Sequence, residues 1–285
     1  LLARMRRSLP PETERAADGE SVGYHALFDR FPNNVCSIWT TMFLDRKCII
    51  FDLDGTLIDS LGIWSQVDQA LIEERSSEHV KVTEEAAYEM RAEAMRRYGE
   101  GSDAYLKFCA DLKAKFGMPG TPEEIHARRY DIAQTFLRTR VDYRPDADKV
   151  LDALKRAGLK LALATTTRRR NVDTYSRENE NLRAKAPLDA FFDMIVTRDD
   201  VKATKPDPEA HLMILEKLGL APEECLVVED AAPGMIAARA AGIDSIVISE
   251  RHAEGEREKL DALAVARFED HAAILAAIEA EAAAR

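Results

Sequence analysis

Two aspartates, Asp52 and Asp54, directly follow a short apolar run at residues 48–51. Such a run predicts a strand buried on both faces of a parallel sheet, and ligands bind at the carboxyl ends of these strands. Side chains two residues apart on an extended segment point the same way, and Gly55 then allows a sharp turn. Two adjacent carboxylates repel each other, so we expect a hard divalent cation, Mg²⁺, to join them. The plainer interpretation is a strand that ends in an ordinary Asp-Gly turn.

Three further polar positions follow apolar runs or turns. Thr165 comes after the apolar run at 161–164, where a hydroxyl can bond a phosphoryl oxygen or can simply begin a loop. Lys205 stands in a Lys-Pro turn, where a lysine is ordinarily a solvated charge. Glu229 and Asp230 end another apolar run, and the plainer interpretation here is an Asp that caps the next helix. Their order along the chain, after the aspartate pair, favours a functional interpretation of all four.

The elements that must position these residues alternate from residue 144 onward. We expect strands at 159–164, 193–197, 226–228 and 245–248, separated by helices that include 207–218 and 233–241. Strands separated by helices of this length predict right-handed βαβ units and one parallel sheet. The expected fold class is therefore α/β with a doubly wound parallel sheet. The Ala-rich segment 270–285 predicts a helix that packs on the outside of the sheet.

The segment between the first strand and residue 144 has a different pattern. Its apolar residues recur at helical spacings between charged ones, and glycine-containing breaks at 99–102 and 117–122 divide it into several helices. Thr121 followed by Pro122 is typical of a helix start. A second, smaller, all-helical domain is therefore expected. The expected boundaries are a leader at 1–41, an α/β core at 42–60 and 144–285, and a helical cap domain at 61–143.

Together, the four motifs resemble those of the haloacid dehalogenase-like phosphohydrolase superfamily. The first motif of that superfamily, Asp-x-Asp-Gly-Thr/Val, is matched by residues 52–56, and the other three are matched at Thr165, at Lys205 and at 229–230. The resemblance implies a Rossmann-like core and a helical cap that closes over the site and excludes water. The sequence departs from the usual pattern at Thr166, where the superfamily has Asn.

The resemblance also implies a role for each residue. Asp52 is the expected nucleophile, which forms an aspartyl-phosphate. Asp54 is the expected general acid and base, so its pKa must lie near neutrality. Thr165 would hold a phosphoryl oxygen, and Lys205 would neutralise charge on the nucleophile and the phosphoryl group. The implied ligands of Mg²⁺ are Asp52, Asp230, the carbonyl of Asp54 and, directly or behind them, Glu229.

Composition bounds the class of protein. The chain has 285 residues, of which 46% are hydrophobic and 32% charged, as is typical of a soluble globular protein. A net charge of −11 argues against a general nucleic-acid or anionic-membrane surface. The four cysteines include no Cys-x-x-Cys pair, which predicts free thiols in a reducing compartment and a cytoplasmic protein. The partner expected is a small phosphorylated substrate, and the sequence does not predict the oligomeric state.

Residues 1–41 differ from the rest of the chain. They begin with basic residues and continue with Gly, Pro and Asn at short intervals and no sustained period. An apolar segment of the signal-peptide type does not follow the basic start. We expect a poorly ordered leader and a natural translation start at Met42.

Two features leave alternatives open. The basic run at 168–170 opens a helix, where positive charge opposes the helix dipole. A solvated turn is the favoured interpretation, and a site for a second anionic group of the substrate is the alternative. Trp64 is expected to pack inside the cap, although an aromatic wall against the substrate is also conceivable.

The favoured function is a Mg²⁺-dependent phosphatase that acts on a small phosphorylated metabolite. The alternative is a sugar phosphomutase of the β-phosphoglucomutase kind, which shares every motif but usually has a His near the position of Trp64. A non-catalytic binding protein on the same fold is a third possibility, because fold does not fix function. Intact Asp52, Asp54, Lys205 and Asp230 argue against it.

Overall fold

The computed structural model describes residues 41–99, 102–250 and 255–285. Within them, parallel strands form one sheet in the order β3-β2-β1-β4-β5-β6. The strands are β1 (Cys48–Phe51), β2 (Lys160–Ala164), β3 (Met194–Val196), β4 (Cys225–Glu229), β5 (Asp244–Ile248) and β6 (Ala266–Phe268). The strand order reverses between β1 and β4, which creates a topological switch point there. The expected α/β class with a doubly wound parallel sheet is confirmed.

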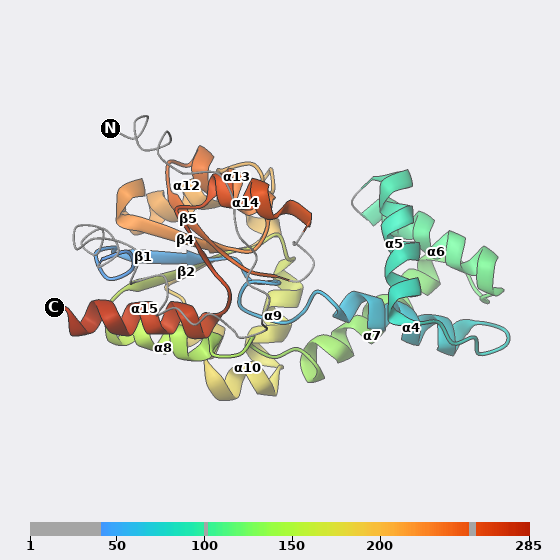
Figure 1. Cartoon of the computed structure of the whole chain (residues 1–285). Coiled ribbons are helices and arrows are strands. Elements are labelled where there is room, and N and C mark those ends of the chain that lie inside the picture. Colours follow the sequence, from blue (N-terminus) through green and yellow to red (C-terminus); the bar gives the residue numbers. More distant parts are fainter. Residues whose placement is uncertain (1–40, 100–101, 251–254) are drawn as a thin grey trace, which may run out of the picture. The chain divides into compact units, whose positions relative to one another are not determined.

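Helices cover both faces of the sheet (Figure 1). The helices of the α/β core are α8 (Ala147–Arg156), α9 (Arg169–Arg177), α10 (Glu180–Lys185), α11 (Leu188–Phe191), α12 (Glu209–Leu218), α13 (Ala232–Ala240), α14 (Arg257–Leu263) and α15 (His271–Ala283). Ile49 and Phe51 of β1 join the apolar core that includes α8 and α15, whereas Cys48 and Ile50 join the core that includes α12. Alternate residues of β1 therefore enter different cores, as the two-residue period of a strand requires.

The segment between β1 and α8 is helical wherever it is regular in the described residues. Its helices are α4 (Ile63–Arg75), α5 (Glu84–Tyr98), α6 (Ser102–Phe116) and α7 (Pro122–Thr139). The predicted break at 117–122 lies between α6 and α7, whereas the one at 99–102 includes residues 100–101, which lie outside the described residues. A further break, at 76–83, was not predicted. Thr121 begins α7 with a capping box, because its hydroxyl accepts from the Glu124 N–H and the Glu124 carboxylate accepts from the Thr121 N–H. The expected all-helical cap is confirmed as part of the fold.

Several predicted boundaries need correction. Helix α12 begins at Glu209 and not at 207, because Pro208 disfavours the helical conformation of Asp207, the residue before it. The strand predicted at 193–197 is limited to residues 194–196, and β6 was not predicted. The expectations of a leader at 1–41 and of a start at Met42 rest on residues 1–40, which lie outside the described residues. Of the helices described, none has the length and apolarity needed to cross a membrane.

Candidate active site

The carboxyl ends of three neighbouring strands bring the predicted residues together. The register pairs Phe51 of β1 with Leu163 of β2 and with Val228 of β4, so these strands end nearly level. Asp52 follows β1 directly, and Thr165 follows β2 directly. The acid pair lies at the end of β4, across the switch point from Asp52. The site therefore lies where an open α/β sheet binds its ligands.

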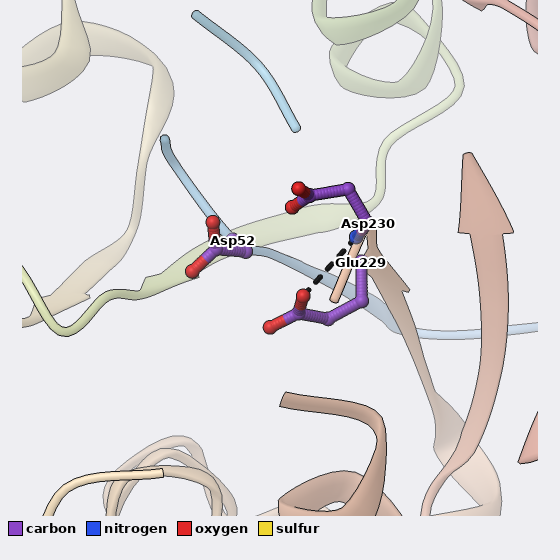
Figure 2. Close-up of side chains that lie close together, drawn as sticks. All are labelled: Asp52, Glu229 and Asp230. Carbon is purple, nitrogen blue, oxygen red and sulfur yellow. Dashed lines mark hydrogen bonds between the residues drawn. The ribbon is translucent and has the colours of Figure 1, made fainter. Parts of the chain in front are cut away.

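Three carboxylates meet at this edge, and we name them the acidic cluster: Asp52, Glu229 and Asp230 (Figure 2). Each contributes a carboxylate oxygen that lies within 4.8 Å of those of the other two. All three side chains are almost completely buried. The side chain of Asp54, whose backbone carbonyl was predicted as a metal ligand, lies outside this group.

Lys205 reaches the acidic cluster from the loop that precedes α12. Its ammonium donates to Asp52 Oδ1 at 2.6 Å and to Glu229 Oε1 at 2.5 Å. The side chain is only 4% exposed, so these ion pairs form in a desolvated setting. The solvated turn that is usual for a lysine is therefore wrong for Lys205.

The acidic cluster holds more negative than positive charge, and burial together with mutual repulsion raises the pKa values of Asp52 and Asp230. Burial raises the pKa of Asp52 well above its usual value, and Lys205 offsets part of that rise. Burial, followed by the charge of Glu229, raises the pKa of Asp230 to about 7. Burial alone would lower the pKa of Lys205, but Asp52 and Glu229 outweigh it and the pKa rises. The positive charge of Lys205 only partly offsets the three carboxylates. A further cation would favour their ionised forms.

The oxygen atoms of the acidic cluster fit a hard divalent cation. Glu229 already uses both oxygens, because Oε1 accepts from Lys205 and Oε2 accepts from the N–H groups of Asp230 and Ala231. Asp230 Oδ1 accepts from the Thr56 hydroxyl at 2.7 Å. Within the described part of the chain, Asp52 Oδ2 and Asp230 Oδ2 accept no hydrogen bond. Two buried carboxylate oxygens without donors are suitable ligands for Mg²⁺.

The carboxylate of Asp54 is bound by two hydroxyl groups and not by Lys205. Its Oδ1 accepts from the Ser60 hydroxyl at 2.5 Å, and its Oδ2 accepts from the Thr167 hydroxyl at 2.5 Å. Burial raises the pKa of Asp54, and the two hydroxyl donors oppose that rise. The raised pKa is the direction that a general acid requires.

Sequence reasoning missed the contribution of Thr167. The backbone N–H of Thr167 donates to Thr165 Oγ1 at 3.0 Å, while its hydroxyl binds Asp54. The buried Thr165 hydroxyl donates to no acceptor among the described residues, so its proton is available for an incoming oxygen. A usable signal was present, since Thr165 and Thr167 have the same two-residue spacing after a strand as Asp52 and Asp54.

Two glycines make room for the carboxylates. A Cβ on Gly234 would overlap Glu229 Oε1, so a side chain there would collide with the buried acid. Gly55 has a φ of +86°, which favours glycine, and a Cβ there would lie 2.5 Å from Asp230 Oδ2. The turn after β1 and the first turn of α13 therefore both require glycine to accommodate the acidic cluster.

Trp64 and the basic run at 168–170 do not join the acidic cluster. Trp64 packs under the guanidinium of Arg129, which lies 5.0 Å from its ring centroid, as expected for a cap residue. Arg169 pairs with Asp200 at 2.5 Å, and Arg170 lies 4.8 Å from the ring centroid of Tyr130. Each of these side chains therefore has a partner of its own.

Comparison with known proteins gives related sequences along most of the chain. A family model described as haloacid dehalogenase-like hydrolase matches residues 46–242. Protein CbbY of Rhodobacter capsulatus is 30% identical over 228 residues, which cover 75% of this chain and 89% of that protein. A phosphorylated carbohydrates phosphatase of Thermotoga maritima is 30% identical over 200 residues, 70% of this chain and 83% of that protein.

Solved structures give the same picture of the fold. The crystal structure of a HAD family hydrolase from Deinococcus radiodurans R1, with bound phosphate and sodium, superposes with a TM-score of 0.61. Its sequence is 26% identical, and the match covers 83% of this chain and 97% of that one.

Proposed function

Because the chain belongs to the haloacid dehalogenase-like hydrolase family, we propose that it is a phosphatase that hydrolyses a small phosphomonoester with Mg²⁺ through an aspartyl-phosphate. One observation carries the proposal: the ammonium of Lys205 joins the carboxylate after β1 to the acid pair at the end of β4. The phosphatase relative makes phosphorylated sugars the first substrates to test. Buried thiols at Cys48, Cys109 and Cys225 are compatible with work in the cytoplasm, while Cys36 lies outside the described residues.

The first half of the reaction transfers the phosphoryl group to Asp52. Asp52 Oδ1, beside the Lys205 ammonium, attacks phosphorus as the bond to the leaving oxygen breaks. Lys205 neutralises charge on the carboxylate and the phosphoryl oxygens, and the Thr165 hydroxyl donates to one of those oxygens. Asp54 gives its proton to the leaving oxygen, so the product departs as an alcohol.

The second half returns Asp52 to its starting state. The ionised Asp54 takes a proton from a water molecule whose oxygen attacks phosphorus. The bond between phosphorus and Asp52 breaks, inorganic phosphate leaves, and Asp54 is protonated again for the next cycle.

Mg²⁺ would be held by Asp52 and Asp230 through their Oδ2 atoms and by the backbone carbonyl of Asp54. Glu229, whose oxygens already accept hydrogen bonds, would orient Lys205 and remain close to the cation. When bound, the cation would supply positive charge to the phosphate oxygens.

The test is phosphate release from a panel of phosphorylated sugars and an aryl phosphate. We expect release that requires Mg²⁺ and stops with EDTA, and that is lost in Asp52→Asn but retained in Asp45→Asn, which changes an exposed acid paired with Arg285. Interconversion of glucose 1-phosphate and glucose 6-phosphate would favour the phosphomutase instead. Phosphate release by a folded Asp52→Asn protein would contradict the role of Asp52.

A further inference from the structure

Arg144 links the turn that follows β1 to the end of β5. It stands where the chain returns from the helical cap to the α/β core, shortly before α8. Its guanidinium donates through Nη1 to the backbone carbonyl of Gly55 at 2.5 Å and through Nη2 to that of Ser249 at 2.8 Å. Its backbone N–H also donates to the Leu57 carbonyl at 2.8 Å. Because β4 lies between β1 and β5 in the sheet, these bonds join elements on either side of β4.

The Ser249 end of this link is fixed by the sheet. The N–H of Ser249 donates to the carbonyl of Phe268 in β6 at 2.8 Å, and its hydroxyl accepts from Arg267 at 3.2 Å. A guanidinium is planar and presents its donors in a rigid fork, so it holds two acceptors at a set separation. The position of Ser249 therefore limits the position of the Gly55 carbonyl.

The turn at residues 54–58 lies directly against the acidic cluster. The Thr56 hydroxyl donates to Asp230 Oδ1 at 2.7 Å, and Gly55 approaches Asp230 Oδ2 so closely that a Cβ would lie 2.5 Å from it. The carbonyl of Asp54 belongs to the peptide group that it shares with Gly55. A displacement of this turn would therefore move both the surroundings of Asp230 and the Asp54 carbonyl.

We propose that Arg144 is a positioning residue that clamps the turn at residues 54–58 against the acidic cluster and so keeps Asp230 Oδ2 and the Asp54 carbonyl in place. The proposal rests on the proposed function, in which these two oxygens hold Mg²⁺. Without the guanidinium, the buried Gly55 carbonyl would lose a charge-assisted hydrogen bond, and the turn would reorient to regain a donor. Arg144 acts through the backbone of the turn and not on the substrate.

Hydrogen exchange in metal-free buffer tests the clamp without cation or substrate. Arg144→Met retains an unbranched side chain and removes the donors. We expect the backbone amides of the turn at residues 54–58 to exchange at least about tenfold faster in this variant than in wild type, because the turn opens locally more often. Mass spectrometry of a peptide that spans the turn measures the rate.

A titration with MgCl₂ gives the second readout. The loss of a group that orients metal ligands typically costs about 10–100-fold in metal affinity or activity. In Arg144→Met, the MgCl₂ concentration that gives half of the rise in melting temperature should increase by about tenfold or more. The value of kcat should fall by about tenfold or more, while KM should change by less than about threefold.

Arg46→Met is the matched control. Arg46 is also a partly buried arginine, and its guanidinium donates to the backbone carbonyls of Glu223 at 2.7 Å and Cys225 at 3.3 Å and pairs with a carboxylate. These contacts lie at the amino ends of the strands, opposite to the acidic cluster. Both variants should melt at a lower temperature than wild type without metal. Arg46→Met should change exchange in the turn, the MgCl₂ response and kcat by less than about threefold.

Arg144→Lys decides the matter if Arg144→Met does not fold. Lysine retains the charge, but its ammonium is a point donor that does not reproduce the fork. We expect the same changes in exchange and in MgCl₂ response, at about threefold or more. Variants of Arg144 that match Arg46→Met in both readouts would overturn the proposal. A wild-type protein that releases no phosphate would contradict the proposed function instead, because neither readout depends on turnover.

Discussion

Two buried ion clusters in this chain have opposite imbalances of charge. In the α/β core, the ammonium of Lys205 binds two of the three carboxylates of the acidic cluster, Asp52 and Glu229. In the helical cap, one carboxylate, Asp68, serves two guanidinium groups: Arg129 through Nε at 2.6 Å and Arg91 at 2.5 Å. We name Asp68, Arg91 and Arg129 the cap cluster. Both clusters are desolvated, so water does not offset the surplus charge in either. Other groups must stabilise the surplus positive charge of one and the surplus negative charge of the other.

Aromatic rings meet the surplus positive charge of the cap cluster. The Arg129 guanidinium lies 5.0 Å from the ring centroid of Trp64, 5.1 Å from that of Tyr105 and 5.8 Å from that of Phe108. The negative faces of these rings attract a cation without a second carboxylate. The acidic cluster instead retains raised pKa values at Asp52 and Asp230. The cap cluster therefore offsets its surplus charge with its own aromatic rings, whereas the acidic cluster retains carboxyl groups whose ionised forms a cation would favour.

Asp52→Asn should give the largest effect and is the first test of this difference. We expect phosphatase turnover to fall by at least about 10,000-fold, since removal of a covalent nucleophile abolishes its path. Stability should not fall, because the neutral amide replaces a buried carboxylate whose ionisation burial opposes. Steady-state kinetics and a thermal melt in metal-free buffer measure both. A clearly lower melting temperature would mean that the charge of Asp52 stabilises the fold.

Asp68→Asn makes the same chemical change in the cap cluster and should have the opposite outcome. It leaves two buried guanidinium groups without a carboxylate, so the free energy of unfolding should fall by roughly 3 kcal/mol or more. The control is Asp103→Asn on α6, which removes an exposed ion pair with Lys107 and should change stability by less than about 0.5 kcal/mol. Denaturant unfolding measures the difference. Equal stability of the two variants would mean that the rings alone hold the arginines.

Addition of Mg²⁺ should stabilise the protein through the acidic cluster. At a free Mg²⁺ concentration a hundredfold above Kd, the gain is about 2.7 kcal/mol, visible as a higher melting temperature. Asp230→Asn should lose most of this gain, because it removes one of the two free carboxylate oxygens. Asp68→Asn should retain the gain, although its melt begins from a lower temperature. A full Mg²⁺ response in Asp230→Asn would place the cation elsewhere.

The acidic cluster could be predicted from sequence because local patterns position it. Asp52, Lys205 and Asp230 stand at strand ends or in a turn, and parallel strands align their carboxyl ends whatever the rest of the chain does. The apolar runs that precede Asp52 and Asp230 are long enough to indicate buried strands. β6 has only three residues, of which Phe268 alone is buried, so it has no such run to reveal it.

Contacts between residues far apart in the chain could not be predicted in the same way. Asp68 and Arg129 are 61 residues apart, and no period or spacing links them, since tertiary packing alone brings them into contact. Thr167 and Asp54 are 113 residues apart; the two-residue spacing after a strand points to Thr167, but only the fold shows that its partner is Asp54. The same holds at residues 42–44, whose backbone N–H groups are bound by the carboxylate of Glu281 from the last helix.

The pH dependence of stability should distinguish the two clusters from a third kind of buried group, a histidine that is neutral in the folded protein. His271, at the start of α15, is 1% exposed, and burial, with the charge of Arg144, lowers its pKa from 6.5 to about 3. Between these two values the unfolded chain binds more protons at His271 than the folded one, so stability falls as pH falls. From pH 7 to pH 5 the loss is about 2 kcal/mol.

The matched measurement is the pH dependence of unfolding in wild type and in His271→Leu. The variant should lose about 2 kcal/mol less than wild type between pH 7 and pH 5, and His211, whose pKa is also lowered to about 3 by burial, should account for a similar loss that remains. The acidic cluster should have the opposite effect on stability. Asp52 and Asp230 have raised pKa values in the folded protein, so the folded state binds more protons there than the unfolded one and stability rises as pH falls. If His271→Leu lost as much stability as wild type between pH 7 and pH 5, the titration of another buried group would cause the loss.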